Sequence, residues 1–148
     1  MSKTQQDRRR IGALLRIPFQ AAVDRIYEGL TSAGYSDMGP AHYVVFQHLP
    51  LEGMHLTELA ERAQITKQSM SYLVDYLQER GYVERVPDPV DGRAKLVRYT
   101  ERGREVDRVA RQIVQRLEED WACRLGEHKM DQLRQLLQEL ITELEKDR

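Results

Sequence analysis

Apolar residues recur at intervals of three and four along much of the chain, which is the spacing of one face of an α-helix. Near the N-terminus this face runs from Ile11 to Leu30 and contains Pro18, so we expect a kink or a break near Leu15. Two more such faces follow late in the chain, and they predict long helices that pack on other helices. Their apolar positions are Val106, Val109, Ile113, Leu117, Trp121 and Leu125, then Met130, Leu133, Leu137, Leu140 and Leu144.

Between these ends the pattern predicts two shorter helices joined by a tight turn. The first spans residues 56–63, and the second begins after Thr66, whose hydroxyl can cap it, and runs to about Arg80 before Gly81 ends it. Its apolar positions form one buried stripe and turn the intervening polar residues outward. The stripe is Met70, Leu73, Val74 and Leu77, and the outward residues are Gln68, Ser71, Tyr72, Asp75 and Glu79. Such a pair is typical of a helix-turn-helix, although a hairpin in an ordinary helical bundle shows the same pattern.

A β-hairpin is predicted directly after this pair. β-branched and aromatic residues fill 82–86 and 94–100, and a Pro, Asp and Gly loop separates them. Arg93 lies just past the hairpin tip, where a cation could enter a DNA minor groove. Asp91 is unsuited to DNA, and we expect its carboxylate to orient the guanidinium of Arg93 or Arg85 by a bidentate bond.

The net charge of −1 argues against DNA binding, but the distribution of charge along the chain does not. A DNA-binding surface is usually basic, yet the whole chain is slightly acidic. Residues 93–104 hold five basic residues against one acid, whereas residues 105–148 hold eight basic residues against eleven acids. The positive charge therefore lies at the hairpin, and the acidity lies away from the surface that would face DNA.

The segments from Leu73 to Arg85 and from Asp91 to Gly103 resemble the MarR family of winged helix-turn-helix transcription regulators. The resemblance covers nearly the whole chain, including a helix that opens at Pro40 and ends near Leu49. It implies that Arg93 reaches the minor groove, that Asp91 orients it, and that residues 67–72 belong to the recognition helix. The DNA-contacting residues expected on this basis are Lys67, Gln68, Ser69, Ser71, Tyr72, Arg93 and Lys95.

The chain departs from the family pattern at two helix ends. Gln64 stands where the family commonly has glycine, so a left-handed backbone there would cost about 1 kcal/mol or be avoided. Gly39 replaces the usual hydroxyl cap before Pro40, which is a mild loss. Family members also commonly bind a small aromatic or anionic effector. The matching surroundings on this chain are Arg16, Phe19, Tyr35, Met38, His42, Tyr43 and Phe46, most of which would also suit a core.

Other chemistry is poorly supported by the sequence. The four histidines show no metal-ligand spacing, and no nucleophile or nucleotide-binding motif indicates an enzyme or a cofactor. Cys123 follows Trp121 closely, and we interpret it as structural or incidental. No apolar run approaches the roughly 20 residues of a membrane span. The first residues lack a signal-peptide core, so we expect a cytoplasmic protein.

We therefore expect a mainly α fold with a small β-hairpin wing. Residues 1–35 would form an N-terminal dimerisation helix, residues 36–104 the winged helix-turn-helix, and residues 105–148 the C-terminal dimerisation helices. The long apolar helices favour a homodimer, which would match a pseudo-palindromic operator in double-stranded DNA. We expect a repressor that an effector releases. The alternative is a winged helix that binds proteins and no DNA, which Asp75, Glu79 and Glu84 near the reading head leave open.

Overall fold

The computed structural model describes residues 9–148 and has the predicted, mainly α fold. Its helices are α2 (Ile11–Ser32), α3 (Pro40–His48), α4 (Leu56–Ala63), α5 (Lys67–Glu79), α6 (Glu101–Leu125) and α7 (Glu127–Glu145). Its strands are β1 (Met54–His55), β2 (Val83–Pro87) and β3 (Lys95–Tyr99). The helix-turn-helix and the hairpin therefore lie where the sequence predicts them.

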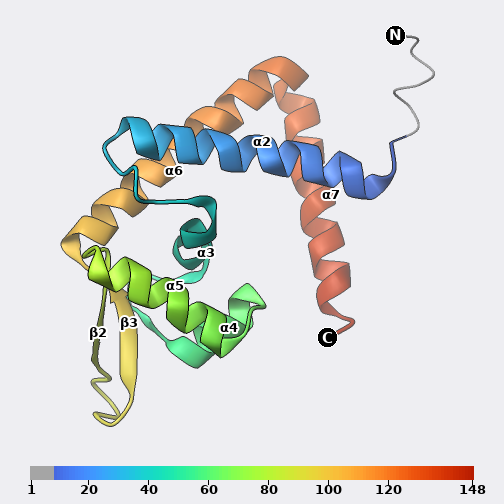
Figure 1. Ribbon diagram of the computed structural model, residues 1–148. Helices are drawn as coiled ribbons and strands as arrows, with labels where there is room; N and C mark the ends of the chain where they lie inside the picture. The colour runs from blue at the N-terminus through green and yellow to red at the C-terminus, as the bar shows by residue number, and fades with distance from the viewer. Residues whose placement is uncertain (1–8) are drawn as a thin grey trace.

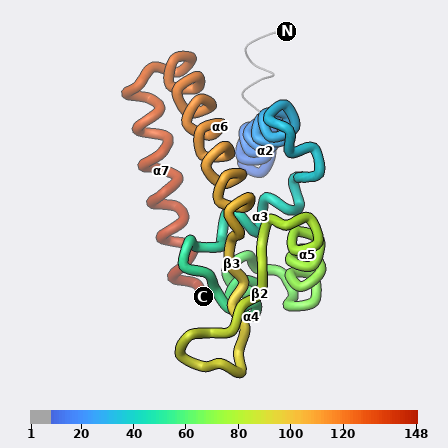
Figure 2. Tube along the Cα trace, turned by 90° about the vertical axis from the view of Figure 1, so that its left-hand side faces the viewer, coloured from blue at the N-terminus to red at the C-terminus, as the bar shows by residue number. Residues whose placement is uncertain are grey.

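The molecule has a reading head and a set of long helices (Figure 1). Helices α3, α4 and α5 form the head, and the β2–β3 hairpin, which we call the wing, projects beyond it. Helix α2 packs against α6, and α7 turns back beside α6 from the far end (Figure 2). The predicted boundary at residues 104 and 105 falls in the first turn of α6, so wing and long helix are joined without a linker.

A three-stranded antiparallel sheet of order β1-β3-β2 supports the wing. Val97 of β3 is the pivot, since it pairs with Met54 of β1 on one side and with Arg85 of β2 on the other. The sequence does not predict β1, because two residues are too few to show the alternation of a strand. This short strand nevertheless ties the start of α4 to the wing.

The core lies where the head meets α2 and α6. Leu30 of α2, Val45 of α3, Leu77 of α5 and Val106 of α6 are almost completely buried and belong to one cluster. Tyr82 is fully buried at the start of the wing, and its hydroxyl donates a hydrogen bond to Asp37 in the loop before α3. The head is thus packed against both long helices, which fixes its orientation.

Helix α2 is continuous, so the expected break near Leu15 is wrong. Pro18 lies inside the helix and leaves the carbonyl of Leu14 without its helical donor. Residues 14–20 are exposed in the single chain, so water can reach that carbonyl and the cost of the lost bond stays small.

Candidate nucleic-acid interface

The start of α5 is fixed by a cap and by an unusual backbone conformation. Thr66 Oγ1 accepts a hydrogen bond from the backbone N–H of Ser69 at 3.0 Å, as the sequence predicts. Gln64 ends α4 with φ 58° and ψ 39°, which is the left-handed conformation. The chain therefore adopts the costly geometry where the family commonly has glycine. The tight turn that results leaves only three residues between the end of α4 and the start of α5.

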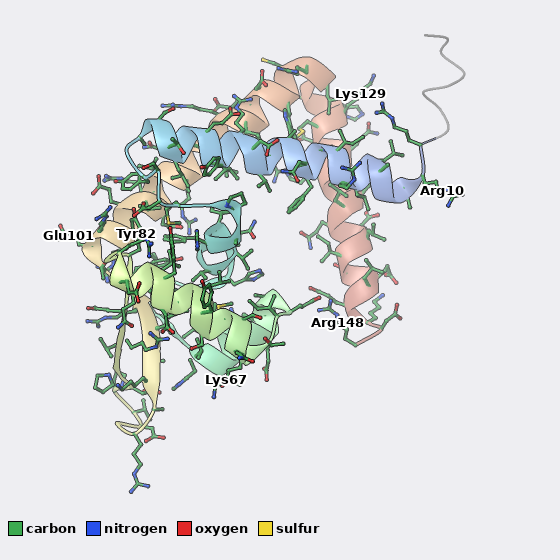
Figure 3. The ribbon with its side chains drawn as sticks, in the orientation of Figure 1. Arg10, Lys67, Tyr82, Glu101, Lys129 and Arg148 are labelled. Atoms are coloured by element: carbon green, nitrogen blue, oxygen red, sulfur yellow. The ribbon has the colours of Figure 1, made fainter. Side chains whose placement is uncertain are left out.

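The first turns of α5 present a mostly polar surface to solvent. Lys67, Gln68 and Ser69 are exposed, and Tyr72 is 75% exposed despite its size. Figure 3 shows Lys67 at the outer edge of the head, on the side toward which the wing extends. Ser71 is half-buried, so it is less accessible than the other predicted DNA-contacting residues of α5. It borders the buried stripe, since it follows Met70 directly and precedes Val74 by one turn.

Arg93 lies exposed at the end of the wing loop. Asp91 Oδ1 accepts a hydrogen bond from the backbone N–H of Arg93 at 3.1 Å. The expected bond from Asp91 to a guanidinium is therefore wrong, because the short aspartate side chain reaches a backbone donor two residues on. Among residues 9–148 no hydrogen bond or ion pair holds the guanidinium of Arg93, and Lys95 beside it is also exposed.

The guanidinium of Arg85 joins the wing to α5 instead. It donates to Asp75 at 2.7 Å and to Gln78 at 2.6 Å, both on α5. Strand β3 and strand β2 are joined in the same way by Arg98 and Glu84 at 2.7 Å. These pairs hold the wing and the recognition helix in one relative orientation.

Arginines neutralise the three acids near the reading head that left a protein-binding function open. Asp75 and Glu84 each lie 2.7 Å from an arginine nitrogen, and Glu79 lies 3.8 Å from Arg80. A carboxylate already paired with arginine repels a phosphate much less than a free one does. On the surface made by the start of α5 and the wing loop, three cations, Lys67, Arg93 and Lys95, and one carboxylate, Asp91, form no ion pair among the described residues.

The seven residues expected around an effector do not form one pocket. Met38 and Phe46 are core residues, and Tyr35 packs edge-on against Tyr82 with 6.3 Å between ring centroids. His42 instead caps α3, because its Nδ1 accepts the N–H of Gly39 at 2.9 Å. Tyr43 lies between α2 and α3, where burial raises the pKa of its hydroxyl. The sequence could not separate a pocket from a core, since both use the same aromatic residues.

Arg16 and Phe19 line a different hollow. This groove runs between the first half of α2 and the helices α6 and α7, and it has a volume of about 670 Å³. Its other walls are almost entirely apolar and include Trp121, Leu133 and Leu137. We call it the long-helix groove. It continues into the apolar face of α7, a helix without a single buried residue in the isolated chain.

Cys123 and the histidines are the remaining side chains that could take part in redox or metal chemistry. Cys123 is exposed near the end of α6, so in the isolated chain it is not a structural residue of the core. His55 Nε2 is hydrogen-bonded to Asp88 Oδ2 at 2.7 Å. Within the described residues, no three histidine, cysteine or carboxylate side chains gather as a metal site would require. Over the same residues, no helix has the length and apolar content needed to cross a membrane.

Comparison with known proteins shows which family this geometry resembles. The model of the MarR family matches residues 36–94, which hold the helix-turn-helix and most of the wing. The crystal structure of CouR from Rhodococcus jostii, bound to p-coumaroyl-CoA, is 27% identical, covers 94% of this chain and 95% of its own, and superposes with a TM-score of 0.72. Residues 36–94 of this chain therefore match the MarR family, and the chain shares the fold of CouR over nearly its whole length.

Two further relatives describe what such proteins do elsewhere. An uncharacterised HTH-type transcriptional regulator of Mycobacterium leprae is 36% identical over 88 residues, which are 57% of this chain and 62% of that protein. A MarR mutant from E. coli, solved with operator DNA, has the same fold at 24% identity and a TM-score of 0.72, covering 88% of this chain and 92% of its own. The chain matches only about 40–62% of the length of the curated relatives. The MarR-family proteins named here are transcriptional regulators.

Proposed function

We propose that this protein is a sequence-specific regulator of transcription that binds double-stranded DNA. The observation that carries the proposal is the surface shared by the first turns of α5 and the wing loop. Three of its four unpaired charges are cations, the exception being Asp91, while the neighbouring acids Asp75 and Glu84 are held by arginines. Helix α5 would enter the major groove with Gln68, Ser69 and Tyr72 at base edges. Arg93 and Lys95 would follow the adjacent minor groove and the phosphates.

The protein would act as a homodimer on a pseudo-palindromic operator. The long-helix groove and the unburied face of α7 support this, because a single chain leaves this apolar surface to water. A second copy related by a two-fold axis would cover it with the same surface. The two recognition helices would then be placed for half-sites about one helical turn, or 34–36 Å, apart.

Regulation would follow the scheme of a repressor that an effector releases. The bound p-coumaroyl-CoA of CouR belongs to that protein, but it supports a small aromatic or anionic effector here as well. An effector can lower operator affinity only if it binds the DNA-free conformation more tightly than the DNA-bound conformation, and the difference is typically about 1–3 kcal/mol. By linkage, operator DNA must weaken effector binding by the same factor, and titrations of aromatic carboxylates and their thioesters with and without DNA would measure both.

Fluorescence anisotropy with two duplexes tests DNA binding directly. One duplex is selected by the protein from a random library, and the other has a scrambled sequence. Arg93→Ala should weaken binding to both duplexes and reduce the salt dependence by about one counterion. Gln68→Ala should reduce the preference for the selected duplex by about 1–3 kcal/mol.

The control is Arg116→Ala, which removes an exposed cation from α6, well away from the proposed surface. This variant should bind both duplexes as the wild type does. If the selection yields no preferred sequence, or if Arg93→Ala binds as tightly as wild type at physiological salt, the DNA-binding proposal is wrong. A winged helix that recognises proteins would then be the better description.

A further inference from the structure

A side-chain hydrogen bond connects the helix-turn-helix to the base of the wing loop. His55 Nε2 lies 2.7 Å from Asp88 Oδ2, although the two residues are 33 positions apart. His55 is the last residue of β1 and directly precedes α4, whereas Asp88 directly follows β2. The side chain of Asp88 is only 14% exposed and that of His55 is 40% exposed, so the contact is partly shielded from water.

Asp88 also organises the loop that carries Arg93. Its other carboxylate oxygen accepts the backbone N–H of Val90 at 2.9 Å, and its own N–H donates to the carbonyl of Ala94 at 2.9 Å. The hydrogen bond from Val90, together with the contact with His55, lowers the pKa of Asp88. The carboxylate is thus ionised at neutral pH and bonded on both oxygens.

The loop depends on Asp88 because the sheet ends before it. The last paired residues of the wing are Pro87 and Lys95, and the seven residues between them have no strand partner. Two backbone bonds and the Asp91 turn close the loop on itself. The His55 contact is the side-chain bond that ties the loop to the head within residues 9–148.

The other charges near His55 are largely paired among themselves. The register places Glu84 and Arg98 on the same sheet face as His55, and they bond each other at 2.7 Å. On α4, Glu58 of the first turn pairs with Arg62 at 3.2 Å. Lys95 points to the opposite face of β3 from Leu96, the partner of His55. Asp88 is therefore the acid that bonds His55.

We propose that His55 is a positioning residue that braces the wing loop through Asp88 and so presents Arg93 to DNA. The inference rests on the proposed function of the wing. His55 holds Asp88 from the side of the head, and Asp88 in turn fixes the backbone of the loop, so the loop presents Arg93 with less freedom of movement.

Three substitutions of His55 separate the brace from simple folding. His55→Ala removes it and should weaken binding to the selected duplex about threefold to tenfold, the range of a partly exposed pair. His55→Gln retains an amide donor and should recover part of that loss. His55→Lys retains an ammonium donor for the Asp88 carboxylate and should also bind more tightly than His55→Ala. His128→Ala, on α7, is the matched control and should leave affinity unchanged.

A second readout needs no DNA. Hydrogen exchange of the Val90 amide, measured by NMR, reports the bond to Asp88. His55→Ala and Asp88→Asn should both speed this exchange, and amides of the α5 core should keep their protection. The combined variant should exchange no faster than the faster single variant, since both changes break one contact.

The outcomes distinguish the inference from the function on which it rests. If the wild type binds no duplex, the proposed function fails and the inference fails with it. If Arg93→Ala weakens binding but His55→Ala neither weakens binding nor speeds exchange at Val90, DNA binding stands and the brace is overturned. A loss of affinity in His55→Ala without faster exchange of the Val90 amide would also overturn it.

Discussion

The imidazole of His42 lies flat against the ring of Tyr76, with 3.8 Å between ring centroids and 4° between ring planes. The same imidazole accepts the N–H of Gly39 through Nδ1, and the guanidinium of Arg80 lies 3.3 Å from the Tyr76 ring centroid. Since Tyr76 also donates its hydroxyl to the carbonyl of Asp37, the cap of α3 and the end of α5 share one polar cluster.

Stability should decline as the pH falls through the range in which His42 gains a proton. Burial, and then the nearby Arg80, lower the pKa of His42, while Asp37 opposes them weakly. Because the pKa in the folded state lies below the unfolded value of about 6.5, the unfolded chain takes up the proton first, and stability is lost below about pH 6.5. Urea denaturation between pH 5 and pH 8 measures this.

The control is His42→Gln, which can still accept the Gly39 N–H but has no proton to gain. The variant should show a flatter stability profile than wild type over that range. Equal slopes for the two proteins would show that the other histidines or the carboxylates cause the pH dependence.

Gln64→Gly should stabilise the protein. Gln64 adopts a left-handed backbone, which is unfavourable for a residue with a Cβ, and glycine adopts it freely. The expected gain is up to about 1 kcal/mol, reduced by the greater freedom of glycine in the unfolded chain. Chemical denaturation checks the sign. Gln64→Val is the opposite control, since a β-branched residue should be worse there than glutamine.

Gly103→Ala should be strongly destabilising. A Cβ at Gly103 would overlap the backbone carbonyl of Tyr82, an atom that cannot turn aside as a flexible side chain can. We expect a loss of about 1–3 kcal/mol, as in other overpacked sites. Gly92→Ala in the wing makes the same chemical change in open space and should stay within about 0.5 kcal/mol of wild type. Equal thermal melting of both variants would contradict the prediction.

Leu137→Lys should weaken the proposed dimer. Leu137 lines the long-helix groove and is 37% exposed in the single chain, so a second copy would bury it. An ammonium buried there should raise the dimer dissociation constant by about tenfold or more. Sedimentation equilibrium measures this, with Gln138→Lys on the exposed face of α7 as the control. A wild-type chain that sediments as a monomer at micromolar concentration would contradict the dimer itself.

Local signals account for what the sequence predicted well. The limits of α5 follow from Thr66 before it and Gly81 after it, and its buried stripe follows from helical periodicity. Such features depend on residues close in the chain, so one sequence suffices to find them. The position of the hairpin was predictable for the same reason.

The features that the sequence did not predict depend on contacts between residues far apart in the chain. Nothing local shows that Arg85 would take Asp75 as its partner, or that Asp91 would bond backbone rather than a guanidinium. The sequence also could not show that the expected effector residues do not share one pocket in the single chain, because the packing of α2, α3 and α6 decides that Met38 and Phe46 are core. The pair of His55 and Asp88 needed strand β1, which is too short for a periodic signal.

Helix α6 connects the long helices to the wing as one rigid element. Its 25 residues make a rod about 37 Å long. At one end, Thr100 caps the helix through Gly103 and bonds the carbonyl of Gly81, so the rod is attached to the wing without a flexible joint. A tilt of about 5° at the far end would therefore displace the wing by about 3 Å. That distance is as long as a hydrogen bond, so a small change among the long helices is enough to carry Arg93 into or out of register with a groove.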